Sequence, residues 1–264
     1  MSTESPAETT ARPADADRPT VRRLTIADLR DALTHGVNDF NARPTHVPFL
    51  CVIYPIVALI AGRAYAGYEF LPLIFPIVAG FALIGPVVAI GLYELSRRRE
   101  QNRPLGWREA LSIVHSPAIW SIVMLGAILL AIFLIWLAVA WAIYVLTLGG
   151  VPETVSGFIR ALFTTNAGWT LILVGNLAGL VFAIGVLAIS VVSFPMLLDR
   201  NPGVATAVAT SVRVVLANPV PMAMWGLIVV GSLIGGAIPL LIGLAVVMPV
   251  LGHATWHLYR KAVD

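Results

Sequence analysis

The sequence has few charged residues and a single cysteine, and these two shortages restrict its class. Only 12% of the 264 residues are charged, against roughly a quarter in an ordinary soluble domain. A further 58% are hydrophobic, which is too many for a soluble fold of this length to cover with polar surface. Cys51 lies in an apolar stretch. A lone cysteine excludes a disulfide framework or a thiolate metal cluster within one chain.

The apolar residues form long runs, which indicate membrane-spanning helices. The main runs are 47–61, 71–93, 119–148, 169–198 and 220–251. A span needs about 20 apolar residues. The last run is long enough for a hairpin of spans at 219–235 and 239–259, turning at the helix-breaking sequence Gly235-Gly236-Ala237-Ile238-Pro239. We therefore expect an all-α, polytopic transmembrane helical bundle of six spans. Five spans result if the last run is one kinked helix.

The distribution of Lys and Arg predicts the orientation, because these residues mark the cytoplasmic side of short loops. With six spans, fifteen of the 17 basic residues lie on one side and only Arg63 and Arg160 on the other. With five spans, Arg260 and Lys261 move to the outer side. The charge distribution thus favours six spans with both termini in the cytoplasm.

Residues 1–24 are rich in Ser, Thr, Ala and Pro, a composition that predicts a disordered cytoplasmic tail.

Three segments in the rest of the chain follow one plan. Residues 25–264 form a single transmembrane domain of three units, at about 25–94, 106–198 and 203–262. Each unit has a short amphipathic stretch, then a polar residue and a proline, then an apolar hairpin. We expect the three stretches, 25–40, 106–115 and 204–217, to be interfacial helices on the cytoplasmic side.

The first stretch shows its pattern most clearly. Thr25 is placed to cap the start of a helix. The spacing predicts one apolar face, with the charged side chains on the other faces. The apolar residues are Ile26, Leu29, Leu33, Val37 and Phe40, and the charged ones are Asp28, Arg30, Asp31 and Asp39.

The predicted spans carry no obvious charge, which argues against an ion-coupled pump. Asn176 is the most polar residue deep in a span. We interpret it as an interhelical hydrogen-bonding residue. The alternative is a polar contact in a transporter or channel for a neutral or apolar solute.

His253 and His257 are the most specific candidate site. Their spacing of four residues places both on one helical face, as a divalent metal or a haem would require. The pair lacks the glutamate of a metalloprotease signature, and histidines near the end of a span also serve as interfacial anchors. We therefore expect no cofactor, with a haem or divalent metal at this pair as the alternative.

Other motifs give no support for an enzyme or a nucleic-acid partner. The sequence has no Gly-rich phosphate loop and no Ser/His/Asp set in a plausible context. Its net charge of +3 is small. The run Arg97-Arg98-Arg99 is suited to contact anionic lipid, although the orientation rule alone explains it.

Three stretches resemble a known family. They are Met248 to Ala262 (MPVLGHATWHLYRKA), His35-Gly36 with Asp39-Phe40, and Gly85-Pro86 with Tyr93 to Arg98 (YELSRR). The chain is similar here to an uncharacterised bacterial membrane family, domain of unknown function 2189, from about residue 25 to the C-terminus. The resemblance implies a multi-span protein of the bacterial inner membrane. Some members carry names that suggest a cytochrome c oxidase subunit, but this chain lacks histidine-rich spans.

The leading prediction is a non-enzymatic, multi-pass inner-membrane protein that packs with or assists another membrane complex. Its partners would be the lipid bilayer and either that complex or a second copy. The alternatives are a haem- or metal-binding accessory protein of a respiratory oxidase, and a transporter or channel for a neutral or apolar solute.

Overall fold

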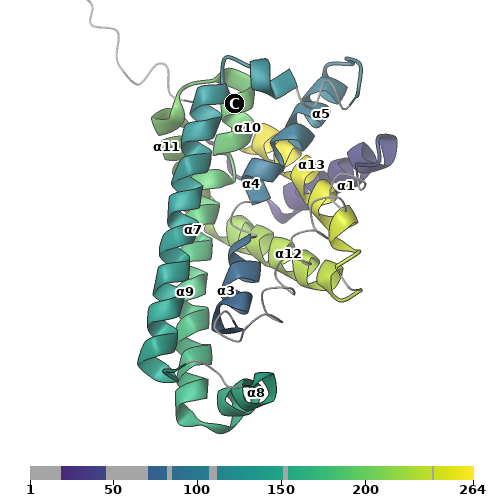
Figure 1. The fold of residues 1–264 in the computed structure, drawn as a ribbon. Helices are drawn as coiled ribbons and strands as arrows, with labels where there is room; N and C mark the ends of the chain where they lie inside the picture. The colour runs from purple at the N-terminus through teal and green to yellow at the C-terminus, as the bar shows by residue number, and fades with distance from the viewer. Residues whose placement is uncertain (1–18, 46–70, 82–84, 107–111, 151–153, 240) are drawn as a thin grey trace, which may run out of the picture.

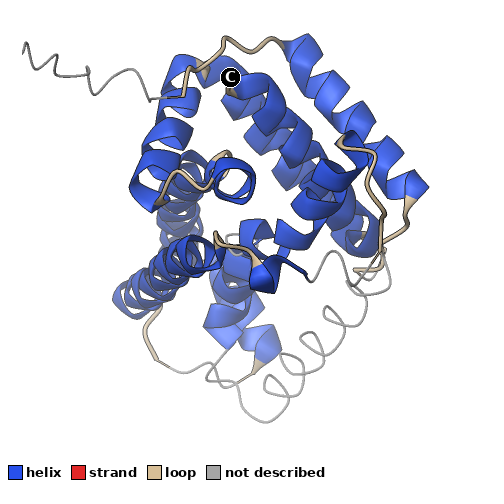
Figure 2. Cartoon of the chain, turned by 90° about the horizontal axis from the view of Figure 1, so that it is seen from above, coloured by secondary structure: helices blue, strands red, loops and turns tan. Residues whose placement is uncertain are grey.

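The computed structural model describes residues 19–45, 71–81, 85–106, 112–150, 154–239 and 241–264 (Figure 1). Over these residues the chain is helical, apart from loops and one isolated β-bridge, which confirms the all-α class (Figure 2). The predicted span at 47–61, with Cys51, lies outside the described residues, as do residues 107–111 of the predicted interfacial stretch 106–115.

The helices follow one another along the chain with mostly short connections. They are α1 (Ile26–Ala42), α3 (Leu71–Phe81), α4 (Gly85–Val88), α5 (Ile90–Glu100), the 3-10 helix η3 (Ser112–His115), α7 (Ile119–Thr147), α8 (Val155–Thr164), α9 (Asn166–Ser190), α10 (Ser193–Arg200), α11 (Val204–Ala217), α12 (Pro219–Ala237) and α13 (Leu244–Ala262).

Among the described residues, three stretches of helix are long and apolar enough to cross a membrane. They are α7 with 29 residues, the nearly continuous α9 and α10 with 35, and α12 with 19. At about 1.5 Å per residue, α7 and α9 both exceed the roughly 30 Å of a bilayer core. The chain is therefore an α-helical membrane protein.

The helices α7 and α9 lie side by side over their length, with α3 beside them (Figure 1). Gly179 allows close packing here, since a Cβ at this position would lie 3.2 Å from the ring of Trp136. The Trp136 indole in turn donates a hydrogen bond of 2.9 Å to the carbonyl of Pro76 on α3. One aromatic side chain thus joins all three helices.

The last apolar block forms two helices, of which α12 but not α13 is among the candidate spans. The helix α12 ends at Ala237 and α13 begins at Leu244, so the break begins at the last two residues of the predicted Gly-Gly-Ala-Ile-Pro turn and extends beyond it. Leu241 adopts a left-handed backbone with φ +68°. Gly236 and Gly243 meet where the two helices diverge, because a Cβ on Gly243 would lie 2.7 Å from the Gly236 carbonyl oxygen.

The N-terminus of α1 is formed as predicted. Thr25 and Asp28 make a reciprocal capping box, in which each side chain accepts a hydrogen bond from the other residue's backbone N–H.

The predicted apolar face of α1 is only partly the buried face, since Leu29 is buried and Leu33 packs against the core. The buried residues are Leu29, Ala32, Gly36 and Asp39, whereas Ile26 and Val37 are 49% and 42% exposed. The reason is close packing against α13, where a Cβ on Gly36 would lie 2.7 Å from the Cβ of Ala254. The small side chains of α1, rather than its largest ones, decide which face meets the neighbouring helix.

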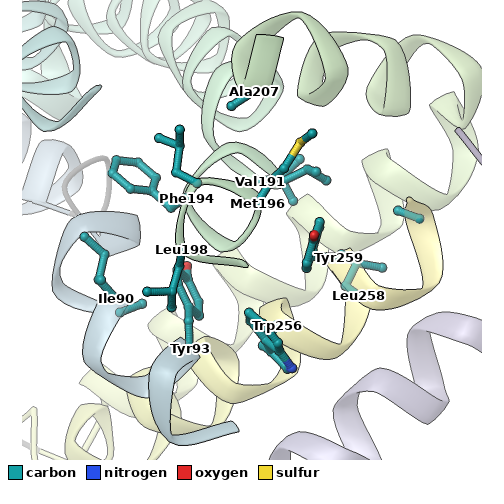
Figure 3. Packing of buried hydrophobic residues seen from close by; sticks show 14 of the residues in the cluster. Ile90, Tyr93, Val191, Phe194, Met196, Leu198, Ala207, Trp256, Leu258 and Tyr259 are labelled. Carbon is teal, nitrogen blue, oxygen red and sulfur yellow. The ribbon is translucent and has the colours of Figure 1, made fainter. Parts of the chain in front are cut away.

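The hydrophobic core lies where α5, α10 and α13 meet. Tyr93, Phe194, Trp256 and Tyr259 are each at most 2% exposed, and Figure 3 shows these side chains gathered between the three helices. By contrast, α7, α9 and α12 expose many large apolar residues, such as Leu146 at 84%. The described part of the molecule thus consists of a packed helical cap and apolar helices that project from it.

The two ends of the described chain meet at this cap. Val21 forms an antiparallel bridge with Val263, and the Asp264 amide donates to the Thr20 carbonyl at 3.1 Å. Asn218, at the start of α12, accepts from the Leu24 amide at 2.7 Å. Residues 19–24, which we expected to be the end of a disordered tail, are therefore held against the C-terminus.

Replacing Gly36 should separate α1 from α13. We expect Gly36→Ala to lower the free energy of unfolding by about 1–3 kcal/mol, because the added methyl overpacks the contact with Val250 and Ala254. Gly231→Ala is the matched control, since a Cβ there meets nothing within 4 Å. Denaturant unfolding in detergent measures both, and equal effects from the two substitutions would contradict the close contact.

Candidate functional site

The two predicted histidines converge with residues from two other helices on one buried carboxylate. The Nε2 atom of His257 lies 2.8 Å from Asp39 Oδ2, and the Ser96 hydroxyl donates to the same oxygen at 2.5 Å. The Nδ1 atom of His253 lies 2.8 Å from Ser96 Oγ. The common face predicted from the spacing of the histidines is confirmed, and it joins α13 to α1 and α5.

The single hydrogen of Ser96 determines the protonation of His253. Because Ser96 donates its hydrogen to Asp39, the contact between Ser96 and His253 requires Nδ1–H of the imidazole to donate to the serine oxygen. The other ring nitrogen, Nε2, is buried and has no hydrogen-bond partner among the described residues. His253 is 1% exposed, so this arrangement holds a neutral imidazole.

Asp39 also receives a positive charge from α5. Arg99 Nη1 lies 2.7 Å from Asp39 Oδ1 and donates to the Asn38 carbonyl at 2.5 Å. Burial raises the pKa of Asp39, but hydrogen bonds from His257 and Ser96 and the coulombic effect of the nearby histidines outweigh it, so the pKa lies below the ordinary value. Asp39 is thus an ionised carboxylate at neutral pH although it is only 7% exposed.

A rim of more exposed polar groups continues this cluster along α1. The rings of His35 and His257 make a tilted contact, with centroids 5.1 Å apart. Lys261, near the end of α13, pairs with Asp31 at 2.7 Å and Asp28 at 3.6 Å. Exposed pairs of this kind contribute less than about 1 kcal/mol each, so the buried carboxylate is the main polar contact between the two helices.

The order of the groups differs from that of a nucleophilic triad. In a triad the imidazole lies between the carboxylate and the serine, whereas Ser96 here lies between Asp39 and His253. Ser96 is 1% exposed, which leaves no access for a substrate. The geometry therefore suits the positioning of helices rather than attack on a bound molecule.

The same contacts bear on the haem or metal prediction. Among the described residues, no three His, Cys, Asp or Glu side chains are grouped as metal ligands. The Nδ1 atom of His253 contacts Ser96 while its Nε2 atom has no partner among the described residues, whereas the Nε2 atom of His257 is held by Asp39. Ligation by His253 and His257 remains a prediction.

Sequence reasoning missed Asp39 and Ser96 as members of this site. Asp39 was assigned to a polar face, yet it lies on the same stripe of α1 as Ala32 and Gly36. A run of small residues on one helical face was the available signal, because small residues mark close helix contacts. Nothing local marked Ser96, whose partners are 57 and 157 residues away in sequence.

Asn176 lies on the outward surface of α9 rather than inside the bundle. The side chain is exposed, and its amide nitrogen donates a hydrogen bond of 2.7 Å to the Ile172 carbonyl of the same helix. It makes no other hydrogen bond within the described part of the chain. Leu173, Leu177 and Leu180 beside it are 56–64% exposed. The predicted bond to another helix is therefore not made by any described helix.

Comparison with known proteins supports the membrane class. Residues 74–199 match the model of a family described as a predicted integral membrane protein, domain of unknown function 2189. The resemblance is confirmed. The matched segment runs from α3 to α10 and includes Ser96 and Asn176, while Asp39 and the two histidines lie outside it. No curated protein and no solved structure matches the chain.

Removing the carboxylate should leave several buried groups unpaired. We expect Asp39→Ala to lower the free energy of unfolding by about 3 kcal/mol or more, because Ser96, His257 and Arg99 lose their common partner. Asp31→Ala, which breaks an exposed pair, should cost less than about 1 kcal/mol. Unfolding in detergent measures both, and a loss at Asp39 no larger than at Asp31 would refute the role of the cluster.

The lowered pKa of Asp39 predicts a pH dependence with a definite sign. A carboxyl whose folded pKa is below its unfolded value, about 3.9, stabilises the protein above that value and loses this contribution as pH falls through the folded pKa. The stability difference between wild type and Asp39→Asn should shrink as pH falls from about 5 to below about 4. A difference that widens on acidification would show the opposite sign.

Proposed function

We propose that this chain is a non-enzymatic, multi-pass protein of the bacterial inner membrane that packs through α9 with another membrane protein. The observation that carries the proposal is Asn176, a carboxamide exposed in the middle of an otherwise apolar surface.

The amide of Asn176 has hydrogen-bonding groups without partners in the described part of the chain. Within the described residues, only one N–H of Asn176 has a partner, and its Oδ1 has none. Lipid chains offer neither donor nor acceptor, so such a group facing lipid is costly. A helix of a partner protein satisfies it, and interhelical bonds of this kind contribute about 0.6–2 kcal/mol.

The surroundings of Asn176 suit a helix at close range. Gly175 precedes it, and a Cβ there meets nothing within 4 Å. Small residues beside a polar one are typical of helix–helix interfaces in membranes. A solute pathway would need the amide to line the inside of the bundle, whereas it lies on the outer face of the α7–α9 pair. The geometry thus favours a partner helix over a transported solute.

The proposal includes the topology. Both termini lie in the cytoplasm, supported by the bridge between Val21 and Val263, because ends that meet require an even number of crossings. Six spans meet this condition and five do not. In this arrangement α1 and α11 lie at the cytoplasmic interface, and the buried cluster around Asp39 fastens α1 to the last helix. No haem or metal is required.

Site-specific photocrosslinking in cells tests the proposal. A photoreactive amino acid at position 176 should give a discrete protein adduct, because a partner helix lies against it. The same residue in place of Leu227, which is 68% exposed on α12, is the control and should react mainly with lipid. An adduct of twice the chain's mass would identify a second copy as the partner.

Co-purification shows whether the adduct reports an equilibrium contact. The crosslinked partner, once identified by mass spectrometry, should be recovered at lower yield with Asn176→Leu and at unchanged yield with Leu227→Ala. Lipid adducts alone at position 176, or equal recovery with both variants, would rule out packing through this face.

A further inference from the structure

The helix α8 carries an exposed apolar stripe beside a polar one. Val155, Ile159 and Phe163 recur every four residues, so they lie along one side of the helix, and they are 44%, 50% and 58% exposed. The polar stripe next to it consists of Ser156, Arg160 and Thr164. This division is typical of a helix that lies in the plane of a membrane surface. The helix α8 is not among the three interfacial stretches expected from the sequence.

Contacts with both neighbouring helices fix the position of α8. Thr165, between α8 and α9, has an extended backbone with φ −115° and ψ 152°, which separates the two helices. Its hydroxyl donates to the Ala161 carbonyl at 2.7 Å and accepts from the Gly168 amide at 2.9 Å. A Cβ on Gly168 would overlap the Ala161 carbonyl oxygen, so the end of α8 lies directly against α9. The Phe158 ring lies 6.2 Å from the Tyr144 ring of α7.

The helix α8 lies at the level of lipid headgroups. Figure 1 shows it at the end of the α7–α9 pair opposite the cap. The 29 residues of α7 extend about 44 Å at about 1.5 Å per residue. This length matches the roughly 40–45 Å of a bilayer with its headgroups. Because α7 leads from the cap to α8, the helix α8 lies in the headgroup layer of the leaflet opposite the cap.

The apolar stripe of α8 continues the exposed apolar surface of α9. The rings of Phe163 and Trp169 meet edge to face with centroids 6.3 Å apart, and the Trp169 indole donates to the Phe163 carbonyl at 3.2 Å. Trp169 and Leu173, one turn apart on α9, are 50% and 61% exposed. The helix α9 belongs to a candidate span, and exposed tryptophan near the end of a span is typical of the membrane–water interface. The bilayer that surrounds α9 therefore also meets the stripe of α8.

We propose that α8 binds the membrane surface opposite the cap, with its apolar stripe among the upper acyl chains and Arg160 beside the lipid phosphates. Transfer of the exposed stripe from water to acyl chains is favourable in proportion to the apolar area that it buries. The exposed guanidinium of Arg160 complements the negative charge of the phosphates. The inference rests on the membrane class of the chain and not on a partner helix at Asn176, so the two proposals can fail separately.

Fluorescence quenching in vesicles tests this proposal on the full-length protein. Cys51 is the single cysteine, so a Cys51→Ser background accepts one environment-sensitive fluorophore at a chosen position. The labelled variants are Ile159→Cys and Phe163→Cys on the stripe, with Thr164→Cys as the matched control on the polar side. Leu134→Cys, at a residue 56% exposed in the middle of α7, reports the hydrocarbon core. The vesicles contain equal amounts of phosphatidylcholine and phosphatidylglycerol.

The labels on the stripe should report the depth of the headgroup layer. At positions 159 and 163 a nitroxide on the lipid near the headgroup should cause a larger loss of fluorescence than a nitroxide near the end of the acyl chain. The label at position 134 should show the reverse order. Iodide in the aqueous phase should quench the label at position 164, whereas the labels at positions 159 and 163 should be protected from it.

Three results would overturn the proposal. Equal quenching by iodide at positions 159, 163 and 164 would place the stripe in water. Protection of positions 159 and 163 from both iodide and the lipid nitroxides would show that protein, such as a second copy, covers the stripe. The same depth order at position 159 as at position 134 would place α8 in the hydrocarbon core. If Phe163→Cys does not fold, because it loses the contact with Trp169, positions 159 and 164 decide.

Discussion

The arrangement of the helical cap depends on one buried carboxylate. Asp39 binds a hydroxyl from α5 and an imidazole from α13, and it pairs with a guanidinium that is also on α5. An ionised group at 7% exposure is stable only when such partners surround it. The carboxylate therefore fixes the position of three helices that are far apart in sequence, and removing any one helix leaves charged or polar groups without partners.

Close backbone packing makes this contact possible. Gly36 brings α1 against Val250 and Ala254 of α13, and this approach places Asp39 within reach of both histidines. The bridge between Val21 and Val263 closes the same end of the molecule. The cap thus combines an apolar core with a polar cluster, whereas the projecting helices α7 and α9 present mostly apolar side chains to their surroundings.

Hydropathy along the chain predicted the helical class, the α7 and α9 helices and the break between α12 and α13, because each depends on a run of neighbouring apolar or helix-breaking residues. The helix cap at Thr25 was also predictable, because it depends only on neighbouring residues. The buried face of α1 was not predictable from side-chain size, since Gly36 and Ala32 are selected by the neighbouring helix. The histidine pair was recognised from its spacing, but Asp39 and Ser96 join it through contacts that only the tertiary fold creates.

A double-mutant cycle between Asp39 and His257 tests the central claim most directly. The free energy of unfolding is measured in detergent for wild type, Asp39→Asn, His257→Leu and the double variant. If the carboxylate and the imidazole form the pair seen at 2.8 Å, the two effects should be non-additive by about 1 kcal/mol or more. Additive effects within about 0.3 kcal/mol would show that the two side chains do not interact, and the account of the cap would be wrong.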